Sequence, residues 1–369
     1  MEYAFILGNT PKLSIAEIIS SVKNCTIKTQ TDQVCIVESA VELNYQYLIN
    51  KLGGTIKIAS LIPSLPLSSS YEGKDKLKFG FSFYALDPAI NPSYLFNLKQ
   101  KYRRQGLDFK KQMRQEKKRA ELIESKDLTL SSVIITKEKC LDILVMVDKD
   151  KKEIYGQTIA VQPFREFSHR DYDRPNKDMR SGMLPPKVAR MMVNIAAGNP
   201  NDVLLDPFCG SGTILQEALL LGYNKVIGTD ISQKAITDTK ANLEFLKLTN
   251  FELFKLDACH LTSRLKSNTV KTIVTEVFLG PPKFYETEID KIVCQLTALY
   301  QKAFTDMKRI LKPEAKLVVA FPAWRLKNRT IHLPIKKVLL QLGYNLKGQP
   351  ILYGRPDARV LREIYILNC

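Results

Sequence analysis

The sequence predicts an α/β fold for the C-terminal half of the chain and a smaller α+β region before it. Three observations support this prediction. From about residue 183 onward, apolar strand-like runs alternate with helical stretches, a pattern typical of a doubly wound sheet. In the first 62 residues the expected order of elements is β-α-β-β-α-β, which is ferredoxin-like. A very basic helical segment among short strands lies between these two regions.

Length and charge narrow the class of protein. A chain of 369 residues is long enough for roughly two or three domains, and 45% hydrophobic residues allow sizeable cores. The formal net charge of +17 favours a polyanionic partner, because each Lys or Arg near a phosphate releases a condensed counterion. The alternative is a Lys-rich composition with no role in nucleic-acid binding.

Cysteine usage and the N-terminus point to a cytoplasmic protein. The seven cysteines are scattered without a CxxC pair and only three His are present, so we expect no metal site and no disulfide framework. The first residues lack the basic and long apolar regions of a signal peptide. No run of about 18 uncharged apolar residues indicates a membrane span.

The ferredoxin-like elements come first. Strands are expected at 3–8, 25–30, 33–39 and 55–62, of which the middle two form a hairpin. One helix is expected at 14–22, where Ser14 and Glu17 have the spacing of a capping box. A second helix is expected at 41–54, closed by Gly53-Gly54. A Ser-, Pro- and Gly-containing stretch at 64–76 follows.

A second small unit contains the basic helix. Strands are expected at 78–86, 130–138, 141–148 and 153–164, and a helix at 91–122. From Lys99 to Arg119 this helix carries ten Lys or Arg against two acidic residues, which favours a phosphate-tracking surface over a merely solvated face. The candidate nucleic-acid contacts are Lys99, Lys101, Arg103, Arg104, Lys110, Lys111, Arg114, Lys117, Lys118 and Arg119.

The C-terminal region holds a candidate cofactor turn. Strands are expected at 202–208, 225–231, 251–258, 272–278 and 315–322, with a closing pair around 351–354 and 360–367. The first of these strands reaches Asp206, the turn FCGSGT follows, and a helix begins at Thr213. Gly210 and Gly212 allow the backbone to pass close to a ligand. The third Gly of a dinucleotide fingerprint and the Lys of a P-loop are both absent.

Carboxylates at three strand ends favour S-adenosylmethionine over NAD. Asp206 would repel a diphosphate, whereas it suits a cationic amino-acid group. Asp230 ends the second strand and is placed to accept hydrogen bonds from two ribose hydroxyls. Asp257 lies at the end of the third strand, where an adenine amino group is expected, and capping of a helix is its alternative role.

The motif DPFCGSGTILQEAL, residues 206–219, resembles the first cofactor motif of class I methyltransferases that act on RNA. The order of parts resembles the THUMP-containing tRNA guanine-N2 methyltransferases, and RDYDRPNKDMRSGMLPPKVARMMVNIA extends the match. The resemblance covers nearly the whole chain and is specific in residues 170–231. It implies a ferredoxin-like domain at 1–70, a THUMP RNA-binding domain at 71–164, a linker at 165–182 and a Rossmann-like methyltransferase domain at 183–369. The implied partner is tRNA, with guanosine N2, typically at position 10, as the target. The need for a small activator protein stays open.

The same resemblance assigns site residues. Asp206, Cys209, Gly210 and Gly212 would line the methionine side of S-adenosyl-L-methionine. Asp230 would hold the ribose with Ile231 against the adenine, and Asp257 and Ala258 would border the adenine edge. Met183, Leu184 and Pro185 would pack beside the cofactor, although Met183 could instead buttress the domain junction. We interpret Cys209 as a packing residue and not as a nucleophile, while His169 and Arg170 are candidate phosphate contacts. Trp324 could border the base pocket or pack in the core.

The catalytic loop departs from the family pattern. Amino-group methyltransferases of this class usually carry Asp-Pro-Pro-Tyr, or Asn first, after the fourth strand. The carboxylate or amide and a backbone carbonyl accept the N–H groups of the target amine, so that its lone pair can attack the methyl group. Residues 275–282 read TEVFLGPP, so Glu276 matches the charge and Phe278 is the candidate stacking aromatic. Two alternatives to an active tRNA methyltransferase remain: a catalytically impaired tRNA-binding protein and a DNA amino-methyltransferase.

Overall fold

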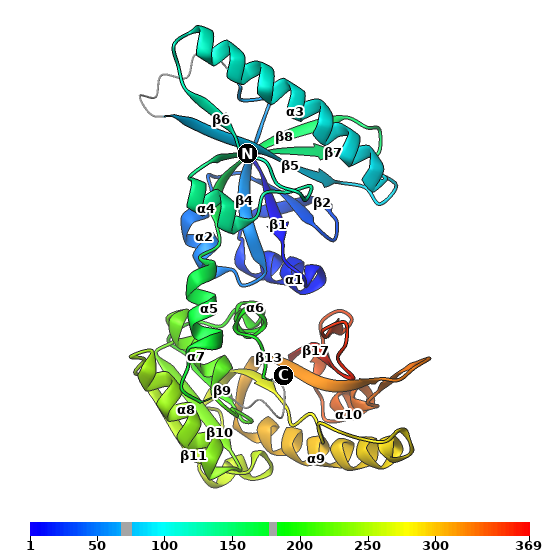
Figure 1. Ribbon diagram of the computed structural model, residues 1–369. Coiled ribbons are helices and arrows are strands. Elements are labelled where there is room, and N and C mark those ends of the chain that lie inside the picture. Colours follow the sequence, from blue (N-terminus) through cyan, green and yellow to red (C-terminus); the bar gives the residue numbers. More distant parts are fainter. Residues whose placement is uncertain (68–75, 177–182) are drawn as a thin grey trace. The chain divides into compact units, whose positions relative to one another are not determined.

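The chain forms two compact units, Met1–Glu166 and Phe167–Cys369 (Figure 1). The structure is a computed structural model, and it describes residues 1–67, 76–176 and 183–369. Most of the predicted Ser-, Pro- and Gly-containing stretch at 64–76 and part of the predicted linker at 165–182 therefore lie outside the described residues. The ranges given above for the three domains and the linker stay predictions.

Unit 1 is built on one eight-stranded sheet with the strand order β2-β3-β1-β4-β8-β7-β5-β6. Its first part has the predicted β-α-β-β-α-β order. The elements are β1 (Glu2–Leu7), α1 (Pro11–Ser21), β2 (Cys25–Gln30), β3 (Val34–Ser39), α2 (Tyr45–Lys51) and β4 (Thr55–Ile62). Strand β4 pairs antiparallel with β8 (Glu153–Val161), so the ferredoxin-like elements and the following ones share one hydrogen-bonded sheet.

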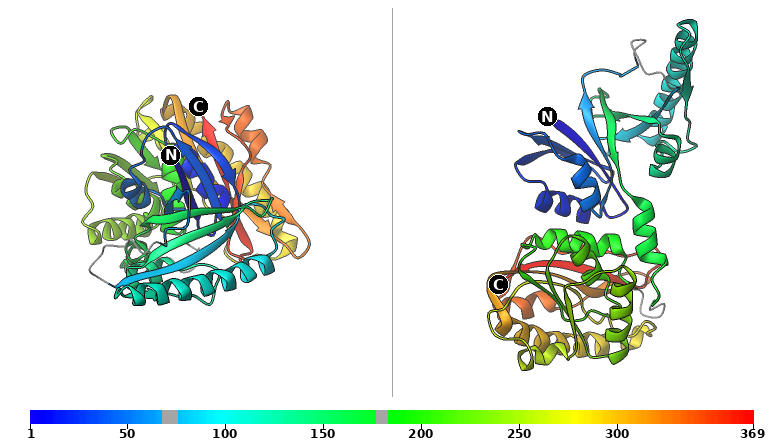
Figure 2. Two further views of the ribbon diagram at one scale, coloured as in Figure 1. Left: turned by 90° about the horizontal axis from the view of Figure 1, so that it is seen from above. Right: turned by 90° about the vertical axis from the view of Figure 1, so that its left-hand side faces the viewer.

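The second part of unit 1 places the basic helix on the sheet. Its elements are β5 (Leu77–Ala85), α3 (Pro92–Gln115), β6 (Ala120–Leu122), α4 (Ser132–Glu138), β7 (Leu141–Val147) and β8. The views in Figure 2 show α3 lying along the β5–β7 part of the sheet. Phe109 of α3 meets Phe79 with ring centroids 5.4 Å apart, and Tyr102 meets Phe81 at 5.2 Å. The apolar stripe of α3 is therefore buried, and its basic residues face away from the sheet.

A buried ion pair joins the strands in the middle of this sheet. The side chains of Lys57 on β4 and Asp142 on β7 are 1% and 0% exposed, and their Nζ and Oδ2 atoms are 2.9 Å apart. Ser82 of β5 and Thr158 of β8 donate hydrogen bonds to Asp142 at 2.6 and 2.7 Å. Four strands from both parts of unit 1 thus meet at one polar cluster.

Three element predictions in unit 1 were wrong in their details. The helix at 91–122 ends at Gln115, and Ala120–Leu122 forms β6 parallel to β5. The segment 130–138 is not a strand, because Ser132–Glu138 forms α4. The Ser131 hydroxyl accepts a hydrogen bond from the Ile134 N–H and caps this helix. Helix α2 is also shorter than predicted, since Asn44 caps it on the N-terminal side.

The predicted capping box at Ser14 and Glu17 was also wrong. Helix α1 begins at Pro11, so Ser14 lies inside the helix and donates a hydrogen bond to the Gly54 carbonyl at 3.1 Å. Glu17 is fully buried and accepts hydrogen bonds from Gly53 N–H and Gly54 N–H at 2.8 and 2.9 Å. This carboxylate therefore fixes the turn before β4.

Unit 2 contains the predicted doubly wound sheet, with the order β11-β10-β9-β12-β13-β17-β15, while β14 and β16 pair with β13 and β17. Its helices are α5 (Phe164–Tyr172, which begins in unit 1), α6 (Pro186–Ala196), α7 (Thr213–Leu220), α8 (Gln233–Phe245), η1 (Ala258–Ser263), η2 (Glu286–Glu288), α9 (Ile289–Ile310) and α10 (Ile335–Gln341). Its strands are β9 (Val203–Asp206), β10 (Lys225–Asp230), β11 (Phe251–Lys255), β12 (Val270–Glu276), β13 (Leu311–Arg325), β14 (Thr330–His332), β15 (Asn345–Leu346), β16 (Ile351–Tyr353) and β17 (Val360–Asn368).

The strand order places the candidate site. Strands β9 to β13 are parallel, and the chain builds the sheet from β9 toward β11 before it crosses back to β12. The carboxyl ends of β9 and β12 are therefore neighbours at a topological switch point, where open α/β sheets bind ligands. Asp206 ends β9 and Glu276 ends β12.

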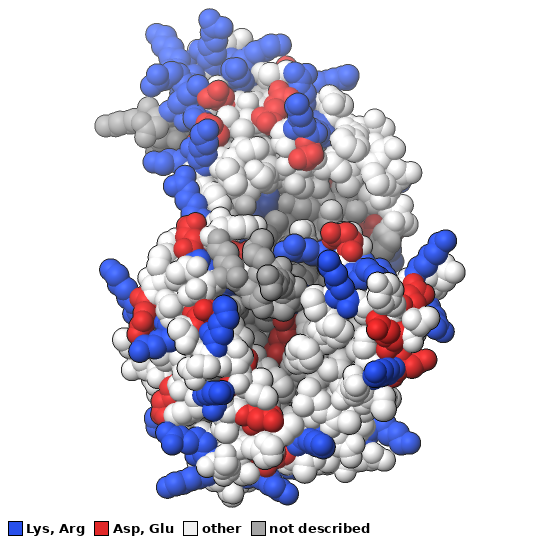
Figure 3. All heavy atoms as spheres, turned by 60° about the horizontal axis from the view of Figure 1, so that its bottom comes forward, with Lys and Arg blue, Asp and Glu red and all other residues white. Residues whose placement is uncertain are grey.

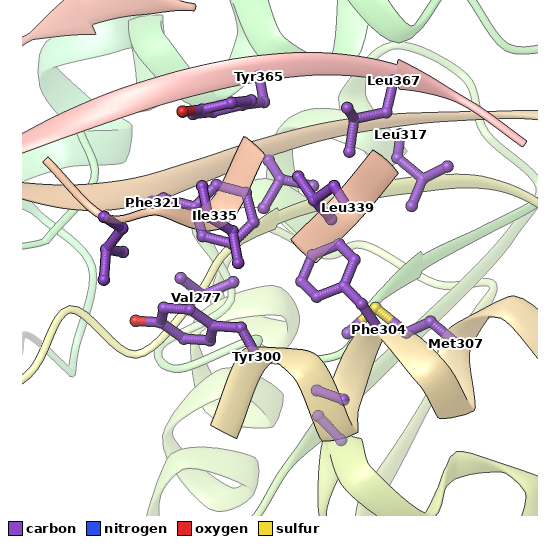
Figure 4. Packing of buried hydrophobic residues seen from close by; sticks show 14 of the residues in the cluster. Val277, Tyr300, Phe304, Met307, Leu317, Phe321, Ile335, Leu339, Tyr365 and Leu367 are labelled. Carbon is purple, nitrogen blue, oxygen red and sulfur yellow. The ribbon is translucent and has the colours of Figure 1, made fainter. Parts of the chain in front are cut away.

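The core of unit 2 supports the loop after β12. Val277, Tyr300 and Phe321 pack together with further apolar residues of α9, β13 and β17 (Figure 4). The ring centroids of Tyr300 and Phe321 are 5.4 Å apart, and the Tyr365 ring meets Phe321 at 5.3 Å. Since Val277 is 1% exposed, the residue directly after Glu276 is anchored in this core.

Two absences hold for the described residues. None of their helices is both long and apolar enough to cross a membrane. Residues 1–67, 76–176 and 183–369 also contain no group of three or more His, Cys, Asp or Glu placed to hold a metal ion.

Candidate functional site

The turn between β9 and α7 is shaped by its glycines. Gly210 has φ +51°, and a Cβ atom added there would meet no atom within 4 Å. Gly212 has φ +84°, and a Cβ atom there would meet the Thr239 Cγ2 atom at 2.7 Å. The Thr239 hydroxyl also donates a hydrogen bond to the Gly210 carbonyl at 2.7 Å. The turn is therefore held against α8. Its backbone at Gly210 borders open space, so a ligand could approach the backbone closely there.

Asp206 is a buried carboxyl group beside this turn. It is 1% exposed and accepts hydrogen bonds from the Thr275 hydroxyl at 2.6 Å and the Phe208 N–H at 3.2 Å. Burial raises its pKa to about 7, and these two hydrogen bonds oppose the rise. A ligand ammonium placed against Asp206 would supply the missing cation.

Asp230 and Ile231 lie at the end of β10, beside the turn. The Asp230 carboxylate accepts hydrogen bonds from Gly210 N–H at 3.0 Å and Ser232 N–H at 2.8 Å, which orients it toward the turn. Ile231 is 68% exposed, which is unusual for a large apolar side chain and agrees with a flat partner resting on it. The ribose and adenine roles of these residues stay predictions.

Asp257, which follows β11, caps a helix, as the alternative to an adenine contact predicted. Asp257 accepts a hydrogen bond from the Cys259 N–H at 2.9 Å and caps η1, while Ala258 is 3% exposed. A contact of Asp257 or Ala258 with adenine stays a prediction. Cys209 is 5% exposed, and burial raises the pKa of its thiol well above the ordinary value, in keeping with the packing interpretation.

Arg174 joins the segment before α6 to the cofactor turn. It is 2% exposed, and its Nη1 and Nη2 atoms donate hydrogen bonds to the Thr213 hydroxyl at 2.8 Å and the Met183 sulfur at 2.9 Å. Its Nε atom has no hydrogen-bond partner among the described residues. Met183 thus contacts a residue that reaches the start of α7, and Pro185 directly precedes α6. Arg174 was not identified from the sequence, because nothing in its neighbourhood marks it as buried.

Arg170 was wrongly considered as a phosphate contact. It is 5% exposed, and its guanidinium donates a hydrogen bond to Glu217 of α7 at 2.9 Å. Arg190 of α6 donates to the second oxygen of the same carboxylate at 2.6 Å. His169 is half-exposed and pairs with Asp173 at 2.8 Å. The Arg170–Glu217–Arg190 cluster therefore ties α5 and α6 to α7.

The loop after β12 carries the candidate catalytic residues. Arg362 of β17 donates hydrogen bonds from Nε to Glu276 Oε1 and, at 3.3 Å, from Nη2 to Oε2. Phe278 is 56% exposed, and its carbonyl accepts a hydrogen bond of 2.5 Å from the Tyr300 hydroxyl. Burial raises the pKa of the Glu276 carboxyl, and the Arg362 cation opposes this rise. Neither Arg362 nor Tyr300 was identified from the sequence. Trp324 is fully buried in the core cluster, so of its two predicted roles it has the one in core packing and not the one at the base pocket.

Of the ten basic residues of the α3 region, five have hydrogen-bond or ion-pair partners and five have no ion pair among the described residues. Lys99 donates three hydrogen bonds, to the carbonyls of Ser125, Lys126 and Asp127. Lys101, Arg103, Lys111 and Lys118 form ion pairs with Glu153, Glu124, Asp108 and Glu116. Within the described ranges no ion pair is found for Arg104, Lys110, Arg114, Lys117 and Arg119, which we call the unpaired α3 cations. Figure 3 shows Lys and Arg gathered over this end of unit 1.

Comparisons with known proteins agree with this geometry. Residues 174–336 match a family model described as RMKL-like, methyltransferase domain. A tRNA (guanine(10)-N2)-dimethyltransferase of Pyrococcus abyssi is 28% identical over 208 residues, which cover 55% of this chain and 56% of that protein. A relative from Methanothermococcus thermolithotrophicus, named "Probable tRNA (guanine(10)-N2)-dimethyltransferase", is 32% identical over 136 residues, or 36% of this chain and 78% of that relative. The chain belongs to the tRNA (guanine(10)-N2)-dimethyltransferase family.

Family membership confirms the resemblance stated from the sequence and implies S-adenosyl-L-methionine as the methyl donor. The aligned part covers only about half of the length of two of these relatives, 56% for the Pyrococcus abyssi protein and 50% for that of Methanocaldococcus jannaschii. TrmN from Thermus thermophilus has a TM-score of 0.57 at 14% identity, covering 100% of this chain and 99% of that one, which confirms the predicted fold class. A second family model, described as DNA methylase, matches residues 49–241. That range ends within α8, before the Glu276 loop.

Proposed function

We propose that this member of the family is an S-adenosylmethionine-dependent tRNA methyltransferase that methylates guanosine N2, of the position 10 type. The observation that supports it most is that the cofactor turn and the candidate catalytic carboxylate lie at the ends of two neighbouring strands, at the switch point of the sheet. The cofactor turn with Asp206 follows β9, and the Glu276 carboxylate ends β12, the neighbouring strand. The family relatives named above carry this activity in their names.

The residues around the turn suit S-adenosyl-L-methionine. The open space at Gly210 can admit a ligand against the backbone, and Asp206 can accept hydrogen bonds from an ammonium. Asp230 and the exposed Ile231 lie on the side where a ribose and an adenine would follow. When bound, the cofactor supplies an electrophilic methyl group on a sulfonium.

Glu276 and Phe278 act on the base. The Glu276 carboxylate accepts an N–H hydrogen bond from the exocyclic amine, which is a poor nucleophile because its lone pair is delocalised into the ring. The exposed Phe278 ring offers a stacking surface for a base taken out of its helix. Glu276 would hold the amine with its N2 lone pair directed at the methyl group that the cofactor supplies, and the amine proton would leave to water after methyl transfer. No covalent enzyme intermediate and no strong base are needed.

In this proposal, unit 1 binds the tRNA. The ferredoxin-like elements and the predicted THUMP part at 71–164 would hold the RNA and set the distance to the target base. The unpaired α3 cations are the best candidates for phosphate contacts, because ion-paired Lys and Arg have already neutralised part of their charge. Lys99 is expected to contribute least, since backbone carbonyls already surround its ammonium.

The decisive experiment uses labelled S-adenosylmethionine and the host's total tRNA. After incubation with the purified chain, the tRNA is digested and the labelled nucleoside is identified. We expect labelled N2-methylguanosine, with none when duplex DNA replaces tRNA. Label in DNA would support a DNA amino-methyltransferase instead. Bound cofactor without any labelled nucleoside, on tRNA that lacks the modification, would point to a tRNA-binding protein without turnover or to a missing activator protein.

A further inference from the structure

The last strand of the sheet reaches into the candidate catalytic loop. In the strand order β12-β13-β17, Glu276 lies opposite Ala320 of β13, and Arg362 of β17 lies opposite Pro322. Arg362 therefore crosses β13 to reach Glu276. It contacts both oxygens of the carboxylate, and the side chains of Arg362 and Glu276 are only 11% and 18% exposed.

The loop backbone is fixed independently of this ion pair. The Val277 N–H donates a hydrogen bond to the Ala320 carbonyl at 3.2 Å, and the Tyr300 hydroxyl donates to the Phe278 carbonyl. The position of the Glu276 Cα atom is therefore set, whereas its side chain is one methylene longer than that of Asp. A longer side chain has one more rotatable bond and needs its own restraint to hold a carboxylate within about 1 Å.

We propose that Arg362 is a positioning residue that holds the Glu276 side chain in one conformation and keeps its carboxylate aimed at the exocyclic amine of the substrate base. This inference rests on the proposed function. Two of the carboxylate's lone-pair positions are taken by the guanidinium, and the rest remain for the amine N–H. The pair thereby replaces the restraint that a shorter Asp side chain has by itself.

The charges around Glu276 explain why the pair also controls ionisation. Asp206 of β9 adds a second carboxyl group nearby, and Tyr353 of β16, the cross-strand partner of Arg362, adds a phenol. Arg362 is the cation that contacts the Glu276 carboxylate directly. Without it, burial and the neighbouring Asp206 would both favour the protonated acid, which lacks the negative charge that makes a carboxylate a strong acceptor for the amine N–H.

The first test measures methyl transfer as a function of pH for wild type, Arg362→Lys and Arg362→Met. For Arg362→Met we expect kcat to fall about 100-fold, as for a misplaced catalytic group, with little change in KM for S-adenosylmethionine. Activity requires the ionised carboxylate, so a higher pKa moves the acid limb of the profile to higher pH. Arg362→Lys should restore part of the rate, because an ammonium can replace one of the two hydrogen bonds.

Arg359→Met is the matched control. Arg359 lies near the same sheet edge, 4.4 Å from the Phe284 ring centroid, and it is exposed. This variant loses the same charge and should keep the wild-type pH profile. If Arg362→Met retained the wild-type kcat and acid limb, the positioning role would be overturned even though the enzyme is active.

A second readout does not depend on turnover. The pKa of Glu276 is measured by ¹³C NMR on glutamate-labelled protein, with Glu276→Gln identifying the signal. We expect the pKa to be higher in Arg362→Met than in wild type and unchanged in Arg359→Met. An unchanged pKa in Arg362→Met would refute the pairing. A raised pKa together with a wild type that never methylates tRNA would overturn the proposed function and leave the pair itself established.

Discussion

Asp206 combines two properties that rarely occur together at a surface-facing ligand site. It is almost completely buried, yet its purpose in the proposed site is to meet a cation. Because burial raises its pKa to about 7, part of the Asp206 population is neutral near physiological pH before a ligand binds. An arriving ammonium favours the ionised form, so cofactor binding should expel the proton.

We therefore predict that affinity for S-adenosylmethionine depends on pH. Below the pKa of about 7, a proton must leave Asp206 before the ammonium can pair, so affinity should fall about tenfold per pH unit. Isothermal titration calorimetry between pH 5.5 and 7.5 measures this slope. Asp206→Asn should bind weakly with no such slope, and it should remain folded because it removes a buried ionisable group. An equal slope in Asp206→Asn would assign the proton to another residue.

Separate effects are expected for the two candidate catalytic side chains. Glu276→Ala removes the acceptor for the amine N–H, so we expect kcat to fall about 100-fold with unchanged tRNA affinity. Phe278→Ala should weaken productive base binding by about 1–3 kcal/mol, the contribution of one stacked base. Single-turnover kinetics and a filter-binding assay distinguish the two. Equal losses in rate and affinity for both variants would contradict these roles.

At the residue scale, local sequence order predicted the strand-end carboxylates but not their partners. Asp206 and Glu276 follow short apolar strands, and parallel strands bring their carboxyl ends to one edge. Arg362 lies 86 positions after Glu276, and its pairing depends on β17 being the neighbour of β13. Such a contact is set by sheet topology, for which no local pattern exists.

At the scale of one element, the unpaired α3 cations and the other basic residues of the α3 region are expected to contribute differently to tRNA binding. We predict that Arg104→Gln/Lys110→Gln/Arg114→Gln weakens tRNA binding and lowers the salt slope of log K by roughly two to three, because each phosphate that is no longer neutralised lowers it by about one. Fluorescence anisotropy with labelled tRNA at several salt concentrations measures both quantities.

The control for this variant removes the same charge elsewhere. Lys302→Gln/Lys336→Gln/Lys337→Gln changes three exposed lysines of α9 and α10 in unit 2. If net charge alone attracts tRNA, both triple variants should lose affinity equally. A loss confined to the α3 variant places phosphate contacts on that helix.

The elements that were predicted wrongly share a physical cause. Val133-Ile134-Ile135 is a β-branched run that favours a strand, but the Ser131 cap and the left-handed Lys139 at its end make it α4. The basic pattern of α3 continues past its end, so charge could not locate Gln115 as the last residue, and only pairing with β5 defines β6. The parallel strands β9 and β12 of unit 2 were predicted well, because short apolar runs of this kind suit strands that are buried on both faces.

For the molecule as a whole, the two units should respond differently to damage in unit 1. We predict that Lys57→Met lowers the free energy of unfolding of unit 1 by about 3–5 kcal/mol, because Asp142 is left buried without its cation. The single Trp of the chain, Trp324, is buried in unit 2 and reports that unit alone. In urea titrations, part of the circular dichroism transition should therefore move to lower urea while Trp fluorescence does not.

The double variant Lys57→Met/Asp142→Leu should recover part of this loss, because no uncompensated charge remains. A shift of the Trp324 signal in Lys57→Met would instead mean that the two units unfold together.

The pairing of β4 with β8 also determines how long β4 stays unpaired during synthesis of the chain. Strand β4 ends at Ile62 and β8 ends at Val161, so about 100 further residues must leave the ribosome before β4 has its neighbour. At about 5–20 residues per second this takes roughly 5–20 s. During this interval the newborn chain exposes an open sheet edge that can join another strand. Slow or paused translation between these points should raise the demand for chaperones and the fraction of protein lost to aggregation.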